Sequence, residues 1–241
     1  MKYLICNLKA NKTIHEILDY EKSLQEIDRK EIELIMAPQD PYLAILKSDK
    51  YSLCSQDISL YNDLRLTGDT SIDALKSIGV TYTIIGHYER RKYYKETELE
   101  IKEKINQALK ENIKVIYCIG ETLEEHLRKV DYQVLERQIA RILNFIPNKE
   151  FKNIIIAYEP TYMIGDKQSY DFKKIESNIQ FIKNIIDNYY HGEIKVVYGG
   201  SINLDNIIDF CNIKSLDGLM VSRSIQEVKN IKKIIDNMTT L

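Results

Sequence analysis

Short apolar runs alternate with longer amphipathic segments along the whole chain. The apolar runs are rich in β-branched residues, which is typical of buried strands. They lie at residues 3–7, 33–37, 52–56, 82–86, 114–119, 153–158, 195–198 and 216–221. The segments between them include residues 14–28, 96–111, 122–145, 171–189 and 226–238. Apolar residues in 171–189 recur three and four positions apart, which predicts a helix with one apolar face.

The order of these segments predicts the fold. Strand and helix candidates alternate through eight units, which indicates a parallel sheet covered by helices. No linker or change of composition divides the 241 residues, so we expect one domain over residues 1–241. An open, doubly wound sheet would show the same alternation. Eight units in a chain of this length are the usual size of a closed (β/α)₈ barrel, which we predict.

The charge of the chain argues against several classes of partner. It has 34 basic and 36 acidic residues and a formal net charge of −2, so we expect neither a nucleic acid nor an anionic membrane as partner. No apolar run approaches the roughly 18 residues that a membrane span needs. The apolar run at the N-terminus is too short for a signal peptide. We therefore expect a soluble, cytoplasmic protein.

The cysteines and most histidines carry no signal for a metal site. Four cysteines stand singly in the chain, at Cys6, Cys54, Cys118 and Cys211. Their spacing does not match that of metal ligands, and we interpret them as reduced thiols. Three histidines, at His15, His126 and His191, lie in predicted helix or turn segments, where we expect solvated side chains. We expect no metal and no organic cofactor.

Polar residues that are unusual for a core follow seven of the predicted strands. Lys9 follows the first, His87 the fourth and Glu159 the sixth. Further strand ends are followed by Gln56, Glu121, Ser201 and Ser222. The carboxyl ends of barrel strands are where active sites of this fold gather. A lone lysine or histidine there is usually solvated, but seven such positions in one chain indicate a site.

Five segments resemble the signature segments of the triosephosphate isomerase family. They are Asn7-Leu8-Lys9-Ala10-Asn11, Ile85-Gly86-His87-Tyr88-Glu89-Arg90-Arg91, Cys118-Ile119-Gly120-Glu121-Thr122, Ala157-Tyr158-Glu159-Pro160 and Tyr198-Gly199-Gly200-Ser201-Ile202. Their order and spacings are those of the family. The resemblance implies a (β/α)₈ TIM barrel that interconverts dihydroxyacetone phosphate and D-glyceraldehyde 3-phosphate, a step of glycolysis and gluconeogenesis, without a cofactor.

The resemblance also implies which residues carry the reaction. Glu159 becomes the catalytic base and His87 the electrophile, while Asn7 and Lys9 hold the substrate and its developing charge. These residue types suit the chemistry, because a proton moves between neighbouring carbons through an enediolate that needs a base and prearranged donors. Triosephosphate isomerase is itself the standard example of a glutamate base paired with a neutral histidine.

Further residues are assigned by the same resemblance. Glu89 becomes the partner of Lys9, and Glu121 supports the catalytic residues. The segment that follows Glu159, through Gly165, becomes a mobile lid. The phosphate is held by the backbone at Gly165, Ser201, Ser222 and Arg223. Residues 66–69 resemble the interface loop of the family, so that Thr67 and Gly68 imply a homodimer.

This chain departs from the family where the substrate is shaped. Tyr88 stands in place of a serine and either points away from the pocket or reshapes it, while Ser222 and Arg223 replace a glycine pair. We therefore keep two alternatives to the three-carbon substrate. One is an isomerase of a four-carbon ketose phosphate such as an erythrulose phosphate, and the other is a non-catalytic barrel that retains phosphate binding.

Overall fold

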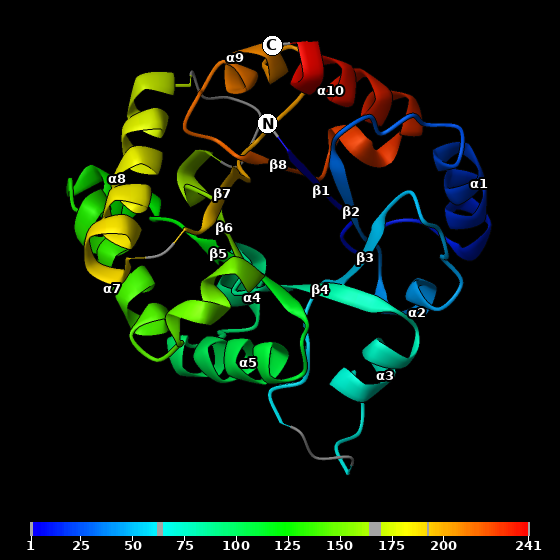
Figure 1. The fold of residues 1–241 in the computed structure, drawn as a ribbon, viewed down its shortest axis with the longest axis horizontal. Helices are drawn as coiled ribbons and strands as arrows, with labels where there is room; N and C mark the ends of the chain where they lie inside the picture. The colour runs from blue at the N-terminus through cyan, green and yellow to red at the C-terminus, as the bar shows by residue number, and fades with distance from the viewer. Residues whose placement is uncertain (1, 62–64, 164–169, 192, 241) are drawn as a thin grey trace.

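The structure, a computed structural model, contains a closed barrel of eight parallel strands (Figure 1). It describes residues 2–61, 65–163, 170–191 and 193–240. The strands are β1 (Tyr3–Asn7), β2 (Glu33–Ala37), β3 (Ser52–Ser55), β4 (Val80–Ile85), β5 (Lys114–Ile119), β6 (Ile154–Tyr158), β7 (Lys195–Tyr198) and β8 (Gly218–Val221). They pair in chain order, and β1 also pairs with β8. The predicted barrel is confirmed, and the open sheet is excluded.

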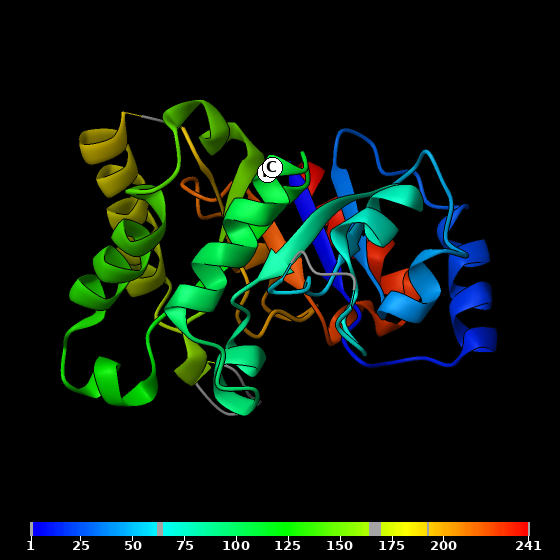
Figure 2. The same cartoon turned by 90° about the horizontal axis from the view of Figure 1, so that it is seen from below.

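Helices surround the barrel, and Figure 2 shows them beside the tilted strands. They are α1 (Ile14–Leu24), α2 (Asp40–Leu43), α3 (Ile72–Ser77), α4 (Tyr88–Tyr93), α5 (Glu98–Lys110), α6 (Leu123–Leu127), α7 (Asp131–Leu143), α8 (Phe172–Tyr190), α9 (Ile207–Cys211) and α10 (Val228–Thr240). Three short 3₁₀ helices are η1 (Asn148–Asn153), η2 (Thr161–Met163) and η3 (Ser224–Gln226). None of the described helices combines the length and apolarity that crossing a membrane demands.

Alternate side chains of each strand pack in two different layers. Ile5, Ile84 and Ile116 belong to the cluster that fills the barrel. Their neighbours along the strands, such as Leu4, pack with helix residues such as Ile17 in the larger outer cluster. All four cysteines are free, and three of them, Cys6, Cys54 and Cys118, are buried as expected.

Two parts of the helix prediction are wrong. The single helix expected over residues 122–145 is two helices, because Lys129 has a left-handed φ of 58° that ends α6 before α7 begins. Three short helices, α2, α3 and α9, were not predicted. They are four to six residues long, which is too short to show a helical period.

Candidate active site

Asn7 and Lys9 form a braced turn directly after β1. Lys9 has a left-handed φ of 53°, a conformation that costs a residue with a side chain about 1–3 kcal/mol. The Asn7 side chain stabilises the turn, because its Oδ1 accepts the Lys9 backbone N–H at 3.0 Å. The Gln56 amide donates to the Lys9 carbonyl oxygen at 3.0 Å and to the Ala37 carbonyl oxygen at 2.9 Å. The ends of three strands thus fix the direction of the lysine.

The Lys9 ammonium is paired with Glu89. Its Nζ lies 2.6 Å from Glu89 Oε1. Burial alone would raise the pKa of Glu89, but the hydrogen bond from the Lys9 ammonium and the positive charge of that ammonium hold it below its ordinary value. The carboxylate therefore stays charged and keeps the ammonium in place.

His87 joins β4 to α4 and faces the base. It caps the N-terminus of α4, where its Nδ1 accepts the Glu89 backbone N–H at 3.3 Å. An Nδ1 that accepts a hydrogen bond carries no proton, so the ring is neutral and its proton is on Nε2. That Nε2 lies 3.3 Å from Glu159 Oε1. The buried imidazole is therefore oriented as a donor toward the site.

Glu159 follows β6 and is only 3% exposed. Its backbone N–H donates to the Ile119 carbonyl oxygen at 2.7 Å. Two glycines make room for it. A Cβ on Gly199 would lie 2.7 Å from Glu159 Cγ, and one on Gly120 would lie 2.0 Å from the Glu159 carbonyl oxygen. Within the described residues, Glu159 Oε2 has no hydrogen-bond partner, which leaves this oxygen available to accept a proton.

Cys118 and Arg91 support the site from β5 and α4. Burial, together with the negative charge of Glu159, raises the pKa of the Cys118 thiol, so the base has a neutral neighbour. Arg91 donates to the Gly86 carbonyl oxygen at 2.7 Å and to the Cys118 carbonyl oxygen at 3.2 Å. One guanidinium thereby ties the end of β4 to the end of β5.

Tyr88 lies against the Lys9–Glu89 pair instead of pointing away from it. Its hydroxyl donates to Glu89 Oε1 at 3.3 Å, and its ring centroid is 5.5 Å from Lys9 Nζ. The ring centroid of His87 is 5.1 Å away. The Tyr88 ring therefore packs beside the ammonium and the imidazole, but Tyr88 is not among the residues that line the cavity described next.

A cavity of about 340 Å³ opens beside Lys9 and His87, and Glu159 is not among its lining residues. Asn7, Lys9, His87 and Glu89 line it, together with Gln56 and further residues of the loops after β2 and β3. Side chains predicted from three distant segments of the chain thus face one concave space. Its size is that of a small-molecule site.

The predicted phosphate residues follow β7 and β8, which pair with each other. The Ser201 carbonyl oxygen accepts hydrogen bonds from Asn206 and Tyr170. The Ser222 carbonyl oxygen accepts the Gln226 amide at 3.1 Å. Both serines are half-buried and Arg223 is exposed. Pairing of Val221 with Cys6 puts Ser222 beside the end of β1. Gly165 lies outside the described residues.

Glu121 follows β5 and contacts the end of β6. It is fully buried and accepts the Tyr158 hydroxyl at 2.8 Å. Its carbonyl oxygen accepts the Thr161 backbone N–H at 2.9 Å. Glu121 therefore holds the residues that come just before and just after Glu159-Pro160. Burial raises the pKa of Glu121 to about 7.

The loop predicted as an interface leaves the barrel between β3 and α3, and its described parts project outward in Figure 1. Thr67 and Gly68 are exposed. Gly68 has a left-handed φ of 93°, which explains a glycine at this position. The base of the loop is closed by a 2.7 Å hydrogen bond from Ser59 Oγ to Asp69 Oδ2.

Some contributions to the site were not predicted from the sequence. Gln56 was noted only as a polar strand end, and the clearance that Gly199 gives to Glu159 was not foreseen. A glycine beside a strand end was the available signal, but its meaning depends on which side chain packs against it. His126 was expected to be solvated, and the structure instead places it in a half-buried pair with Asp131.

Comparison with known proteins gives one consistent result. A family model described as triosephosphate isomerase matches residues 2–238. The chain is similar to the triosephosphate isomerase of Ureaplasma parvum serovar 3, with 35% identity over 240 residues that cover 98% of this chain and 99% of that protein. It is 30% identical to the Alkaliphilus oremlandii protein of the same name, over 95% of this chain and 96% of that one. The Mycoplasma genitalium protein of that name is 32% identical over 95% of both chains.

Proposed function

The chain belongs to the triosephosphate isomerase family and interconverts dihydroxyacetone phosphate and D-glyceraldehyde 3-phosphate, and we propose that Glu159, His87, Lys9 and Asn7 carry out this reaction. The observation that carries the assignment is the 3.3 Å contact between His87 Nε2 and Glu159 Oε1. It joins a donor and a base from different strands at one end of the barrel.

In the first half of the reaction, Glu159 removes a proton from C1 of dihydroxyacetone phosphate. The electron pair of the C–H bond forms the C1=C2 double bond, and the carbonyl π pair moves onto the oxygen of C2. The proton on His87 Nε2 and the Lys9 ammonium stabilise this oxyanion, because both donors are already oriented before charge develops. The product of this step is an enediolate with the proton held on Glu159.

The second half returns the proton to the neighbouring carbon. His87 transfers a proton between the two enediol oxygens, and Glu159 gives its proton to C2. The C1–O group becomes the aldehyde, and no electron leaves the substrate. Both halves of the reaction use the same carboxylate, so the reverse reaction needs no other residue.

The remaining residues hold the substrate. The turn at Asn7 and Lys9 presents the ammonium to the cavity, and Glu89 keeps it there. We propose that backbone N–H groups at Ser201, Ser222 and Arg223, together with Gly165, bind the phosphate. Backbone donors that follow strand ends bind anions without a side-chain charge, and the glycines before Ser201 permit close approach.

Replacement of Glu159 by Asp tests the assignment of the base. The shorter side chain withdraws the carboxylate from the substrate, and a misplacement of about 1 Å typically lowers turnover roughly 10²-fold. We expect such a fall in a coupled assay run in both directions, while competitive inhibition by 2-phosphoglycolate persists. The matched control is Glu124→Asp, which shortens an exposed glutamate of α6.

Three outcomes would contradict the proposal in different ways. Unchanged turnover of the Glu159→Asp variant would remove Glu159 as the base. A wild-type chain that binds 2-phosphoglycolate but turns over neither triose phosphate would match the non-catalytic barrel. Faster turnover of erythrulose phosphate than of dihydroxyacetone phosphate would favour the four-carbon substrate.

We further propose that the chain forms a homodimer through the loop that contains Thr67 and Gly68. The exposed, hydrogen-bonded loop projects from the barrel and carries Leu66, which is 42% exposed. Thr67→Glu should shift the sedimentation coefficient toward that of a monomer and lower activity. A wild-type protein that sediments as a monomer would refute the dimer.

The compartment follows from the substrate. A charged phosphate ester does not cross a bilayer unaided, so the enzyme must share the compartment in which triose phosphates are made. We propose that this compartment is the cytoplasm.

A further inference from the structure

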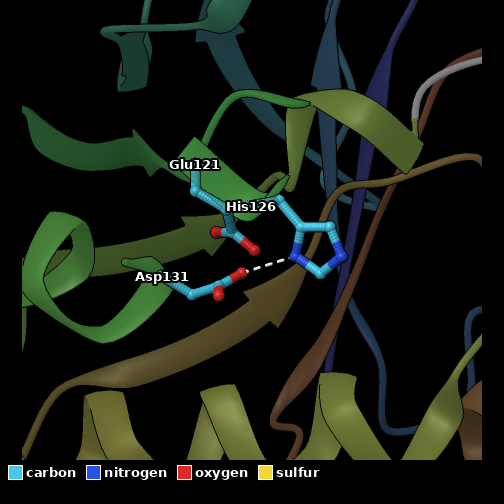
Figure 3. Close-up of side chains that lie close together, drawn as sticks. All are labelled: Glu121, His126 and Asp131. Atoms are coloured by element: carbon cyan, nitrogen blue, oxygen red, sulfur yellow. Dashed lines mark hydrogen bonds and ion pairs between the residues drawn. The ribbon is translucent and has the colours of Figure 1, made fainter. Parts of the chain in front are cut away.

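Three potential metal ligands meet outside the catalytic site. Glu121 follows β5, His126 lies in α6, and Asp131 is the first residue of α7. Figure 3 shows the two carboxylates and the imidazole ring turned toward one another. One ligand atom from each residue lies within 4.8 Å of the other two, and His126 Nδ1 is 2.7 Å from Asp131 Oδ1. The cluster therefore combines one nitrogen and two oxygens.

One buried oxygen of the cluster has no hydrogen-bond partner among the described residues. Glu121 is 0% exposed and Asp131 is 5% exposed. Glu121 Oε1 accepts the Tyr158 hydroxyl, whereas its Oε2 is buried and has no hydrogen-bond partner among the described residues. A buried carboxylate oxygen without a partner is unfavourable, and either a proton or a metal ion relieves it.

Neighbouring residues hold the three side chains in place. Tyr158 and Asn178 both donate to Glu121 Oε1, and hydrogen bonds of this kind orient carboxylates that bind metals. The His126 ring stacks on Tyr162 with centroids 4.1 Å apart and an angle of 15° between the planes. Lys174 Nζ is 3.8 Å from Asp131 Oδ2, which is too long for a strong charge-assisted hydrogen bond.

We propose that Glu121, His126 and Asp131 bind a divalent transition-metal ion of the Zn²⁺ type. An imidazole with two carboxylates is a ligand set of Zn²⁺ and its first-row neighbours, and the imidazole disfavours Mg²⁺ and Ca²⁺. His126 is half-buried, so water can reach the cluster and complete the coordination.

Small movements suffice to form the site. Tetrahedral bonds of about 2.0–2.1 Å place ligand atoms roughly 3.3 Å apart. The His126–Asp131 distance of 2.7 Å must open by about 0.6 Å, while Glu121 moves inward from its present separation of at most 4.8 Å. His126 comes from the last turn of a five-residue helix, which can rotate without disturbing the barrel.

Titration with Zn²⁺ and Co²⁺ tests the proposal. The full-length protein, stripped with a chelator, is titrated by calorimetry with Zn²⁺ and by visible absorption with Co²⁺. We expect one ion per chain and Co²⁺ absorption bands of a four- or five-coordinate site.

Substitutions assign the binding to the cluster. His126→Gln should weaken binding of both ions at least tenfold, and Asp131→Asn should do the same. The matched controls are His15→Gln, which removes an exposed histidine, and Cys211→Ser, which removes the half-buried thiol. Both controls should bind as the wild type does.

Two results would overturn the proposal. One is the absence of stoichiometric binding at 100 µM Zn²⁺, which would assign the cluster to a proton alone. The other is wild-type affinity in the His126→Gln variant, or loss of binding in a control. These readouts measure metal binding and not turnover, so they are independent of the catalytic assignment.

Discussion

Gly199 is expected to set the position of the catalytic base, and its replacement by alanine tests this expectation. A Cβ at this position would lie 2.7 Å from Glu159 Cγ and 2.9 Å from Met220 Cε. The methionine end is flexible and moves readily. Glu159 is tied at its backbone to Ile119, so its side chain must swing away from its contact with His87.

The size of the displacement follows from the same distances. Ordinary contact begins at 3.4 Å, so Glu159 Cγ must move by about 0.7 Å. Misplacement of a reacting group by about 1 Å can lower turnover roughly 10²-fold. We therefore expect kcat to fall roughly 10- to 100-fold. Overpacking should also lower the free energy of unfolding by about 1–3 kcal/mol.

The assay combines kinetics with unfolding. kcat and KM are measured in both directions by coupled assay, and the free energy of unfolding by urea titration. The matched control is Gly79→Ala, because a Cβ there meets nothing within 4 Å but the residue has a left-handed φ of 88°. It should lose roughly 1–2 kcal/mol of stability with kcat unchanged.

Turnover within twofold of the wild type in Gly199→Ala would refute the reasoning, since the base would then tolerate the intruding methyl group. A loss of activity that Gly79→Ala shares equally would also refute it. In that case, lower stability and not a displaced carboxylate would explain the effect.

Two further predictions concern Tyr88 and Glu121. Tyr88→Phe should retain activity within about twofold, because it keeps the aromatic ring. Tyr88→Ser should lower kcat/KM about two- to fivefold, which is the equivalent of losing a cation–π contact of about 0.5–1 kcal/mol with Lys9. Equal kinetics of the two variants would contradict this prediction. Burial raises the pKa of Glu121 from 4.5 to about 7, so the folded protein binds a proton that the unfolded chain releases. The stabilisation from this proton is complete below about pH 4.5 and is lost as the pH rises through 7. Urea unfolding with a chelator present should show that the free energy of unfolding of Glu121→Gln rises relative to that of the wild type between pH 5 and pH 8. A difference between the two free energies that does not change with pH would contradict the prediction.

Much of the fold could be predicted because it depends on short, regular patterns. The strands at residues 3–7, 33–37, 114–119 and 195–198 were placed with their observed bounds. Buried parallel strands form continuous apolar runs, which are visible in a single sequence. The break at Lys129 was missed because a lysine carries no signal for a left-handed φ.

The composition of the site could be anticipated, but its close packing could not. His87 and Glu159 stand out as polar residues at strand ends, and the family resemblance suggested their roles. The position of Tyr88, the first residue of α4, depends on its contact with Lys9, which follows β1, and no spacing along the chain encodes this contact. The pairing of His126 with Asp131 likewise needs the turn between α6 and α7.

Pairing of β1 with β8 has a consequence for how the molecule is made. The first strand of the ring gains its second neighbour only after residues 218–221 have been synthesised. Until then a nascent chain leaving the ribosome has two unpaired sheet edges, which invite aggregation. A chain truncated before residue 218 would keep both edges permanently, although it would still contain Lys9, His87 and Glu159. The order of synthesis therefore delays closure of the ring until β8 has been made.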